Sequence, residues 1–331
     1  MDPLLLNDWH PVAFSEQVAA EGSGTPMLAT DLLETRVLLW RDSGGVLHAW
    51  EDRCPHRGTR LSLGTLHDDA VRCPYHGWTF GKHGRCTRIP ALPDAPLKAQ
   101  VAVYHAQEKY GMVWVCLGTP AHDSPPAFPE FADAMLRKVW CGPYDVQSSA
   151  PRIVENFLDM AHFAFVHEGI LGDQQHPVIP DCVVEKFDDA EYGSGIWARQ
   201  CYAWQPQASK AAVGASDIEY TYRVVRPLTA ILTKNPPGQV REAIALFTQP
   251  LTETSTRVWI VMALNDFTSE QQALRGFQDT IFLQDQPILE SQHPARLPLQ
   301  SGAEVSVQCD RMSLAYRAYL KQQDLRYGVL R

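Results

Sequence analysis

The chain has 331 residues, of which 45% are hydrophobic and 20% are charged, a composition that is ordinary for a globular protein of one large domain or two. The formal net charge of −9 argues against a nucleic-acid backbone as partner. The first residues lack the basic segment of a signal peptide, and no stretch approaches the roughly 20 apolar residues of a membrane span. With eight cysteines and no export signal, we expect free thiols in a reducing cytoplasm rather than a disulfide framework.

The N-terminal third is predicted to be rich in β-strands. Two short apolar runs, 36–40 and 46–50, flank the segment Asp42-Ser-Gly-Gly45, a pattern typical of a β-hairpin because glycine can adopt positive φ. Further strand-like runs follow at 70–72, 78–80, 101–104 and 112–117. This spacing predicts a small antiparallel barrel or sandwich.

A proline-rich segment, 119–129, separates this part from the rest of the chain. Such a composition is typical of a linker between domains. We therefore predict two domains, residues 1–125 and residues 126–331.

The second domain is predicted to mix helices and strands. Helices are expected at 153–166, 268–292 and 310–323, and strand-like runs occupy much of the region 182–264. We expect the α+β class, with an antiparallel sheet flanked by helices.

Four potential metal ligands lie close together in the first domain. Cys54 and His56 stand in one short segment, Cys73 and His76 in another, with 16 residues between the inner pair. This order suits a Rieske [2Fe–2S] cluster, in which two cysteines hold one iron and two histidines the other. A structural zinc site is the alternative, but its usual pattern pairs Cys with Cys and His with His. Because no further cysteine stands beside these ligands, we expect a low reduction potential for a Rieske cluster, on the order of −150 mV.

A second group of potential ligands lies on and just after the predicted helix 153–166. Glu155, Asp159 and His162 fall on one face of such a helix, and His167 follows slightly more than one turn later. The other residues of the segment are mostly apolar, and burying these polar groups unpaired would cost several kcal/mol. The two histidines could converge on one metal if the helix ends or bends between them.

A carboxylate would complete the two-histidine, one-carboxylate set of non-haem Fe(II) enzymes, which leaves positions for O₂ and substrate. Asp285 is the best candidate, because it lies in an apolar stripe of the predicted helix 268–292. Asp279 and Glu290 on the same helix are the competitors. Pro287 is expected to kink the helix close to Asp285.

With both groups in place, the chain resembles the oxygenase (α) component of the Rieske non-haem iron oxygenases. The resemblance rests on Cys-x-His-x16-Cys-x2-His, on Asp-x2-His-x4-His, and on the segments 110–114, 155–167, 285–292 and 310–317. It implies an N-terminal all-β Rieske domain and a C-terminal helix-grip (START-like) catalytic domain. The most similar branches are the caffeine-type N-demethylases and the hydroxylases of saxitoxin-type alkaloids. The runs 293–299 and 326–329 favour the second branch.

The resemblance also implies which residues hold the two iron centres. Cys54 and Cys73 would bind one iron of the cluster, and His56 and His76 the other. A mononuclear Fe(II) would be held by His162, His167 and Asp285.

Asp159 would take the place of the family's bridging carboxylate. In the family this residue contacts His162 and, in a homotrimer, His76 of the partner subunit. A separate NAD(P)H-dependent reductase with flavin or iron–sulfur centres would supply electrons. The expected reaction is hydroxylation or oxidative demethylation of a small nitrogen-containing ring compound. Ring dihydroxylation, O-demethylation and electron transfer alone are the alternatives.

The substrate pocket is expected to be lined by residues between 190 and 285. The apolar and aromatic candidates are Trp197, Tyr202, Trp204, Tyr220, Ile231, Phe247 and Met262, and the polar ones are Arg199, Arg223 and Glu242. Such an apolar, aromatic lining suits a flat or small polycyclic substrate. Because the strand register is unknown from the sequence, the pattern does not decide which of these side chains point inward.

Overall fold

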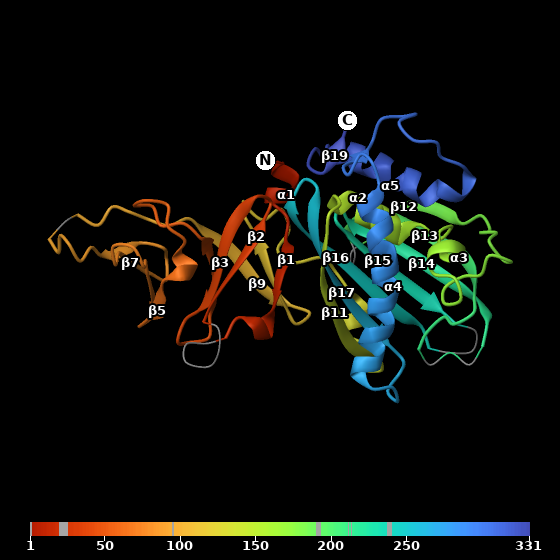
Figure 1. The fold of residues 1–331 in the computed structure, drawn as a ribbon, viewed down its shortest axis with the longest axis horizontal. Coiled ribbons are helices and arrows are strands. Elements are labelled where there is room, and N and C mark those ends of the chain that lie inside the picture. The colour runs from red at the N-terminus through yellow and green to blue at the C-terminus, as the bar shows by residue number, and fades with distance from the viewer. Residues whose placement is uncertain are drawn as a thin grey trace. The chain divides into compact units, whose positions relative to one another are not determined.

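The computed structural model describes residues 2–19, 26–94, 96–189, 193–210, 212, 214–236 and 240–331. The chain divides into two compact units, Pro3–Pro125 and Pro126–Arg331 (Figure 1). All eight cysteines are free thiols, which confirms the absence of a disulfide framework. Of the helices in the described ranges, none is long and apolar enough to span a membrane.

The first unit is built around an antiparallel sheet of six strands. In spatial order these are β1 (His10–Phe14), β10 (Met112–Cys116), β9 (Val103–Lys109), β4 (Leu47–Glu51), β3 (Thr35–Arg41) and β2 (Met27–Leu32). The helical segments α1 (Pro3–Leu6), η1 (Ser15–Gln17) and η2 (Leu61–Leu63) are short. The predicted hairpin is β3–β4, and its turn is held by Asp42, whose Oδ1 accepts from the amides of Gly44 and Val46 at 3.0 and 2.9 Å.

A second, smaller sheet of the first unit carries the Cys–His segments. Its four antiparallel strands are β5 (Thr65–His67), β6 (Ala70–Arg72), β7 (Thr79–Gly81) and β8 (Cys86–Arg88). The first Cys–His segment follows β4, and the second joins β6 to β7. Trp40, Trp50 and Phe80 form a buried core with the two candidate cysteines, Cys54 and Cys73. The same core therefore fixes both segments.

The second unit contains a seven-stranded antiparallel sheet. In spatial order its strands are β11 (Arg137–Val146), β17 (Ser255–Leu264), β16 (Glu242–Thr252), β15 (Thr229–Asn235), β14 (Ser216–Arg226), β13 (Gly193–Gln205) and β12 (Val183–Asp189). Nearly every residue of β16 and β17 is buried, so both faces of the sheet are covered here. The strand pattern predicted between 182 and 264 is confirmed.

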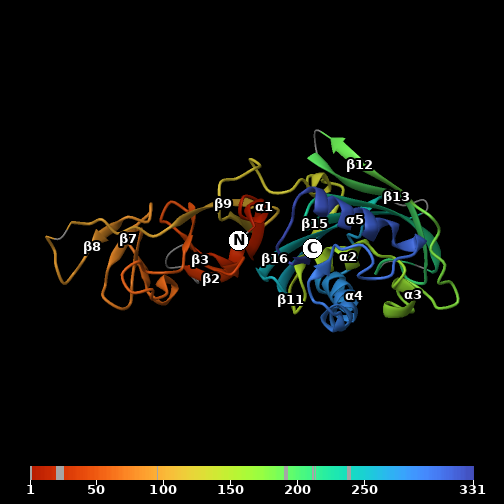
Figure 2. The ribbon, with the colours of Figure 1, turned by 90° about the horizontal axis from the view of Figure 1, so that it is seen from above.

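Helices cover one face of this sheet (Figures 1 and 2). The helices are α2 (Ala150–Leu158), α3 (Phe163–Val166), α4 (Gln271–Ser291) and α5 (Arg311–Gln322). The second unit also contains four short elements, η3 (Pro129–Phe131), η4 (Gln308–Asp310), β18 (Leu297–Pro298) and β19 (Val329–Leu330). The long helix α4 packs on β11, and α2 packs on β15 and β16. On the opposite face Phe128 contacts Phe247 of β16, with ring centroids 6.5 Å apart. This antiparallel sheet with helices confirms the α+β class.

The helix predicted over 153–166 is wrong as one continuous element. The structure ends α2 at Leu158, and α3 begins at Phe163. Asp159 between them is extended (φ −87°, ψ 135°), and its Oδ1 accepts from the amide of Ala161 at 2.8 Å. A short acidic side chain that bonds backbone two residues on competes with the helical hydrogen bond, which is why the helix stops here.

Candidate active site

The two Cys–His segments of the first unit form loops with the same backbone closure. The amide of Gly58 donates to the carbonyl of Cys54 at 2.8 Å, and that of Gly77 to the carbonyl of Cys73 at 3.1 Å. Each cysteine amide donates to the carbonyl five residues ahead, at 2.8 Å in both loops. Both glycines have positive φ, 75° and 70°, where a side chain would strain the backbone. The shared Cys-Pro-x-x-Gly sequence therefore gives two matching loops.

The four side chains of these loops face one another. Cys54 and Cys73 are buried, and the rings of His56 and His76 have centroids 4.5 Å apart. Trp78 stacks on His56 at 4.3 Å, whereas His76 is exposed. Burial and the neighbouring Cys73 thiol raise the pKa of Cys54 to about 11.

This donor set fits a [2Fe–2S] cluster. Nδ1 of His56 is buried and has no hydrogen-bond partner in the structure, an arrangement that costs free energy unless the nitrogen binds something. Cys54 and Cys73 are also buried side by side. As thiolates, two such cysteines can bind one iron of a cluster.

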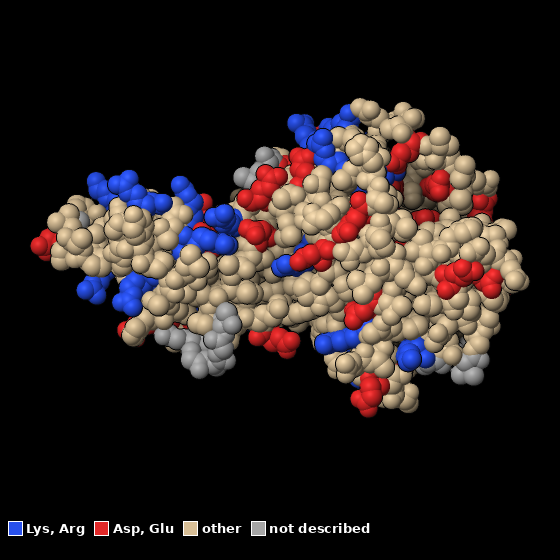
Figure 3. Space-filling model, in the orientation of Figure 1, with Lys and Arg blue, Asp and Glu red and all other residues tan. Residues whose placement is uncertain are grey.

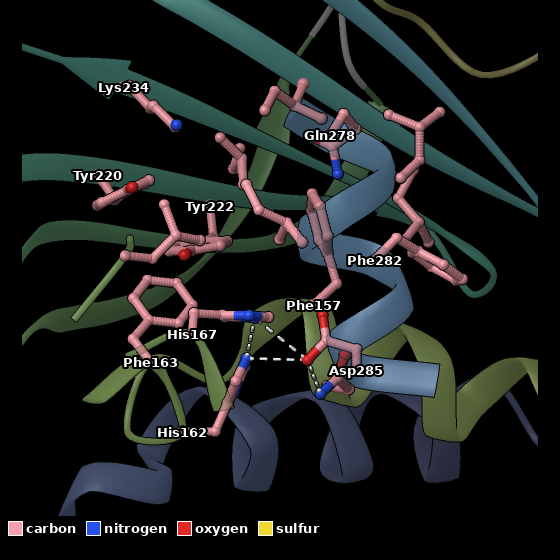
Figure 4. A pocket seen from close by; sticks show the side chains of 17 residues that line it. Phe157, His162, Phe163, His167, Tyr220, Tyr222, Lys234, Gln278, Phe282 and Asp285 are labelled. Atoms are coloured by element: carbon pink, nitrogen blue, oxygen red, sulfur yellow. Dashed lines mark hydrogen bonds and ion pairs between the residues drawn. The ribbon is translucent and has the colours of Figure 1, made fainter. Parts of the chain in front are cut away.

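Three side chains of the second unit converge on one point (Figure 4). The two Nε2 atoms of His162 and His167 lie 3.2 Å apart, and Oδ1 of Asp285 lies 3.4 and 3.2 Å from them. Donors around one ion with bonds of about 2.1 Å would be separated by roughly 3.0 to 3.4 Å, depending on the angle between the bonds. The triangle is therefore of the right size for a single metal ion. His162 caps the start of α3 and His167 its end, so the break after α2 brings the two rings together.

Neighbouring side chains fix the direction of the two histidine donors. Nδ1 of His167 faces Oε1 of Gln284 at 2.9 Å, and Nδ1 of His162 faces Oδ2 of Asp159 at 3.1 Å. Both contacts require a proton on Nδ1, which leaves the lone pair of each Nε2 directed at the shared point. Three lone-pair donors facing each other without a proton repel, unless a cation lies between them. The donor set fits a mononuclear iron.

Asp159 is held in its charged form by these contacts. Burial acts to raise its pKa, but the hydrogen bonds from His162 and from the amide of Ala161 outweigh burial and lower the pKa below its usual range. The carboxylate divides its oxygens, with Oδ1 on the backbone and Oδ2 on the imidazole. It thus ends α2 and orients His162 at the same time.

Glu155, the third polar residue of the predicted stripe, does not face the metal site. Arg317 of α5 binds it with two hydrogen bonds of 2.5 and 2.8 Å, and Arg317 also binds Glu304 at 2.5 Å. Arg152 completes this group of four charges with a contact of 2.7 Å to Glu304. The polar residues of the segment have the partners that the sequence required, but in two separate clusters.

The competing carboxylates on α4 are used elsewhere. Asp279 accepts a hydrogen bond from the hydroxyl of Tyr144 at 2.5 Å, and Glu290 accepts from the amide of Gln147 at 3.1 Å. Asp285 is therefore the α4 carboxylate that the structure brings to the two histidines. α4 runs through Pro287 as one helix from residue 271 to residue 291.

A pocket opens between α4 and the sheet, beside the triangle of His162, His167 and Asp285, which could hold a metal ion and is called the metal-binding triangle below. Its wall is mostly apolar and aromatic, with Phe157, Leu171, Leu246, Ile260 and Phe282 among its members (Figure 4). The polar side chains on the wall away from the triangle are those of Tyr220, Tyr222, Lys234 and Gln278.

Most of the predicted pocket residues lie elsewhere. Tyr220 lines the pocket, but Ile231 and Phe247 do not, because their neighbours Leu232 and Leu246 face it and strand residues alternate between faces. The other predicted residues lie outside the pocket. Two are paired with carboxylates, Arg223 with Glu130 and Arg199 with Glu185, and two pack on other rings, Trp204 on His176 and Trp197 on Phe187. Tyr202 is exposed, and Met262 and Glu242 are buried but do not line the pocket.

Several functional residues were missed from the sequence. Gln278 and Phe282 lie seven and three residues before Asp285, the spacing of one helix face, so the helical period could have found them. Gln284 and Asn156, which contact the metal-site side chains, carry no such signal.

The chain is similar to known proteins over its full length. The family model described as the Rieske [2Fe-2S] domain matches residues 8–105, and the vanillate O-demethylase oxygenase C-terminal domain matches residues 146–323. Methylxanthine N1-demethylase NdmA of Pseudomonas putida is 30% identical over 97% of this chain and 92% of its own length. A probable methylxanthine N7-demethylase, NdmC of Pseudomonas sp. (strain TJI-51), is 37% identical over 81% of this chain and 95% of its own.

Two further comparisons concern a solved structure and a relative that matches only part of the chain. The solved structure of Pseudomonas putida CBB5 NdmA with caffeine matches with a TM-score of 0.82 and 28% identity, over 97% of this chain and 92% of that one. Oxidoreductase NdmD of Pseudomonas putida is 41% identical over 36% of this chain and 20% of its own length.

A cluster-binding domain joined to a mononuclear iron site beside an apolar pocket defines an iron-dependent oxygenase. The chain belongs to the Rieske non-haem iron oxygenases and is an oxygenase component of that family. Its cofactors are a Rieske [2Fe–2S] cluster and a mononuclear iron. The similarity to methylxanthine N-demethylases agrees with the first of the two expected branches, and the saxitoxin-type branch stays a prediction.

Proposed function

We propose that this monooxygenase removes methyl groups from ring nitrogens of small heterocyclic compounds. The observation that carries the proposal is the convergence of His162, His167 and Asp285 at the wall of an apolar, aromatic pocket. Two relatives named for N-demethylation of methylxanthines, at nitrogens N1 and N7, support the same chemistry here.

The proposal assigns a role to each residue of the two sites. His162, His167 and Asp285 hold the mononuclear iron, and the matching loops of the first unit hold the cluster through Cys54, Cys73, His56 and His76. When bound, the cluster supplies electrons and the iron activates O₂, so that one oxygen atom enters a C–H bond and the other becomes water. The apolar wall excludes bulk water from the reacting carbon. A hydroxylated N-methyl carbon then separates as formaldehyde.

A separate reductase supplies electrons to the cluster, and we propose that it is NAD(P)H-dependent. The similarity of about a third of this chain to oxidoreductase NdmD supports this proposal. His76 is the exposed ligand of the pair, so the electron path to or from the cluster runs through its ring.

We further propose a homotrimer in which His76 of the partner subunit approaches Asp159. The charges support this pairing. Residues 53–98 contain eight Lys or Arg and three Asp or Glu in a chain whose net charge is −9. Figure 3 shows basic side chains gathered over this part of the first unit. Asp159 lies in a cavity of about 380 Å³ whose charged lining also contains Glu155, Glu304 and Asp310 together with Arg152 and Arg317, so the acidic side chains outnumber the basic ones by four to two. Opposite charges favour and orient such an association.

The test is turnover of N-methylated heterocycles by the holoenzyme with a reductase and NADH or NADPH. We expect formaldehyde and the demethylated ring in equal amounts, with ¹⁸O from ¹⁸O₂ recovered in formaldehyde that is trapped before it exchanges with water. O-methylated aromatics and unmethylated arenes serve as comparison substrates. Formaldehyde from O-methyl groups alone, or a cis-diol from an arene, would overturn the proposal in favour of O-demethylation or dioxygenation.

A further inference from the structure

Lys234 is the one Lys or Arg among the described residues that line the active-site pocket. It extends from β15 and is buried, with 7% of its surface exposed. Its ammonium group donates to the carbonyl of Ala208 at 2.7 Å and lies 5.9 Å from the centre of the Tyr220 ring. Figure 4 shows Nζ directed into the pocket from the sheet, on the side away from His162 and Asp285.

The contact with Ala208 uses one of the three N–H donors of Lys234, which leaves donors for a ligand. Two further polar groups border the same space. The hydroxyl of Tyr222 is buried and has no hydrogen-bond partner in the structure, and Gln278 lies on the facing helix α4. The sheet side of the pocket therefore presents donors that the protein itself does not satisfy, and a bound molecule with an acceptor oxygen would satisfy them.

The charge around Lys234 favours a neutral acceptor over an anion. Glu242 is its cross-strand partner in the β15–β16 register and is also buried. Burial lowers the pKa of Lys234, while the attraction of Glu242 acts in the opposite direction. Since this carboxylate already balances the ammonium, a fully charged carboxylate ligand would be desolvated without a free positive charge to compensate it. A carbonyl oxygen needs only the donors.

We propose that Lys234 determines specificity by donating to a ring carbonyl of the substrate, so that the substrates are N-methylated heterocycles carrying cyclic amide, imide or urea groups. The inference rests on the proposed function and names its substrate class. The aromatic rings of Phe157, Tyr222 and Phe282 line the pocket, with Phe157 and Tyr222 packed edge to face, and they suit such a ring; the carbonyl at Lys234 directs an N-methyl group toward the metal-binding triangle.

The experiment is a binding cycle between one side chain and one substrate group. Calorimetry on the holoenzyme gives dissociation constants of wild type and Lys234→Met for two compounds: caffeine, and 7-methylpurine, a neutral purine with an N-methyl group and no ring carbonyl. We expect wild type to bind caffeine about 10- to 100-fold more tightly than the purine, as a charged donor to a buried acceptor should give. Lys234→Met should lose that factor for caffeine and change the purine affinity less than about twofold. The corresponding KM should rise while kcat falls less.

Controls separate this role from a structural one. Lys186→Met removes an exposed cation from β12 of the same sheet and should change neither affinity. Lys234→Gln keeps a neutral donor and should bind caffeine with intermediate affinity; it also replaces Lys234→Met if that variant does not fold.

Three results would overturn the inference. They are equal losses for both compounds, no loss for caffeine, and tight binding of aromatic carboxylates but not of carbonyl heterocycles. Because binding is measured without turnover, the two failures can be told apart: a wild type that binds caffeine through Lys234 but releases no formaldehyde from any N-methyl compound would overturn the proposed function, and only the contact between Lys234 and a ring carbonyl would remain.

Discussion

The carboxylate of Asp159 lies 3.1 Å from Nδ1 of His162 and at the same time accepts the amide of Ala161. One side chain therefore sets both the bend of the chain and the direction of an imidazole that we propose as an iron ligand. Asp159→Ala removes both contacts, whereas Asp159→Asn keeps an oxygen for the amide of Ala161, so comparing the two variants tests the two roles separately.

For Asp159→Ala we expect an intact cluster and a loss of coupling between the two iron centres. The cluster absorbance should be unchanged, because Asp159 is not among the proposed ligands of the cluster. Oxidation of the reduced cluster after addition of substrate and O₂ should slow at least about tenfold in a single-turnover experiment, since residues that orient metal ligands have effects of that size. Asp159→Asn keeps an oxygen for the Ala161 amide but loses the carboxylate, so it should show the same slowing. Wild-type rates in Asp159→Asn would reduce the role of Asp159 to bending the chain.

Removal of the Asp285 carboxylate should release the mononuclear iron alone. In Asp285→Ala we expect iron analysis to lose the single mononuclear equivalent, while the cluster spectrum by EPR of the reduced protein persists. Mild chelation of wild type should give the same product, and added Fe(II) should restore turnover in wild type only. Asp279→Asn, six residues earlier on α4, is the matched control and should keep its iron, because Asp279 contacts Tyr144 rather than the histidines. Loss of iron from both variants would contradict the assignment.

Arg317→Met should destabilise the protein by about 3 kcal/mol. The change leaves Glu155 buried with only Arg152 nearby, at 3.9 Å, and an uncompensated buried charge costs on this order. Unfolding by urea with fluorescence detection measures the loss. The double variant Glu155→Gln/Arg317→Met should recover much of it, since the buried charge is removed with its partner. If the loss of unfolding free energy in the double variant equals the sum of the losses in the two single variants, the two side chains act independently and the prediction is wrong.

The hairpin turn of the first unit should lose stability at low pH. A hydrogen bond from Lys82, at 2.9 Å, holds the pKa of Asp42 well below its usual range, although burial acts to raise it. The folded state therefore takes up this proton less readily than the unfolded state. The stabilisation is complete above about pH 5 and is lost as the pH falls through and below about 3.9. Lys82→Met should lower the Tm at pH 7, and its difference from wild type should shrink as the solution is acidified.

The control for that experiment is Lys98→Met, an exposed lysine of the same unit. It removes one positive charge without touching the turn, and its Tm should follow that of wild type at each pH. A Tm difference for Lys82→Met that stays constant between pH 7 and pH 3 would refute the linkage to Asp42.

Local patterns were enough to predict much of this molecule. The hairpin around Asp42, the long helix α4 and the last helix α5 follow from turn residues and from apolar spacing, which are properties of short segments. The choice of Asp285 over its neighbours came from its place in an apolar stripe. The fold class follows from the order of these elements.

What the sequence did not reveal depends on contacts between distant segments or on strand register. The helix breaks at Asp159 because its carboxylate binds the amide of Ala161 in place of a helical hydrogen bond. The periodic pattern of apolar residues across 153–166 gives no sign of this competition. The pocket residues on the sheet were mostly misassigned, because a shift of one position exchanges Ile231 for Leu232. Gln284 became visible as a partner of His167 only once α4 lay beside α3.

Helix α4 carries both a part of the pocket wall and the carboxylate that we propose as an iron ligand. Gln278, Phe282 and Asp285 lie on one continuous helix, and a helix moves as a stiff rod over such a short length. A molecule too large for the space beside Phe282 would push the helix outward and draw the Asp285 carboxylate away from the two histidines. Poorly fitting compounds would then weaken metal coordination at the moment they bind, so size selection would act on reactivity as well as on affinity.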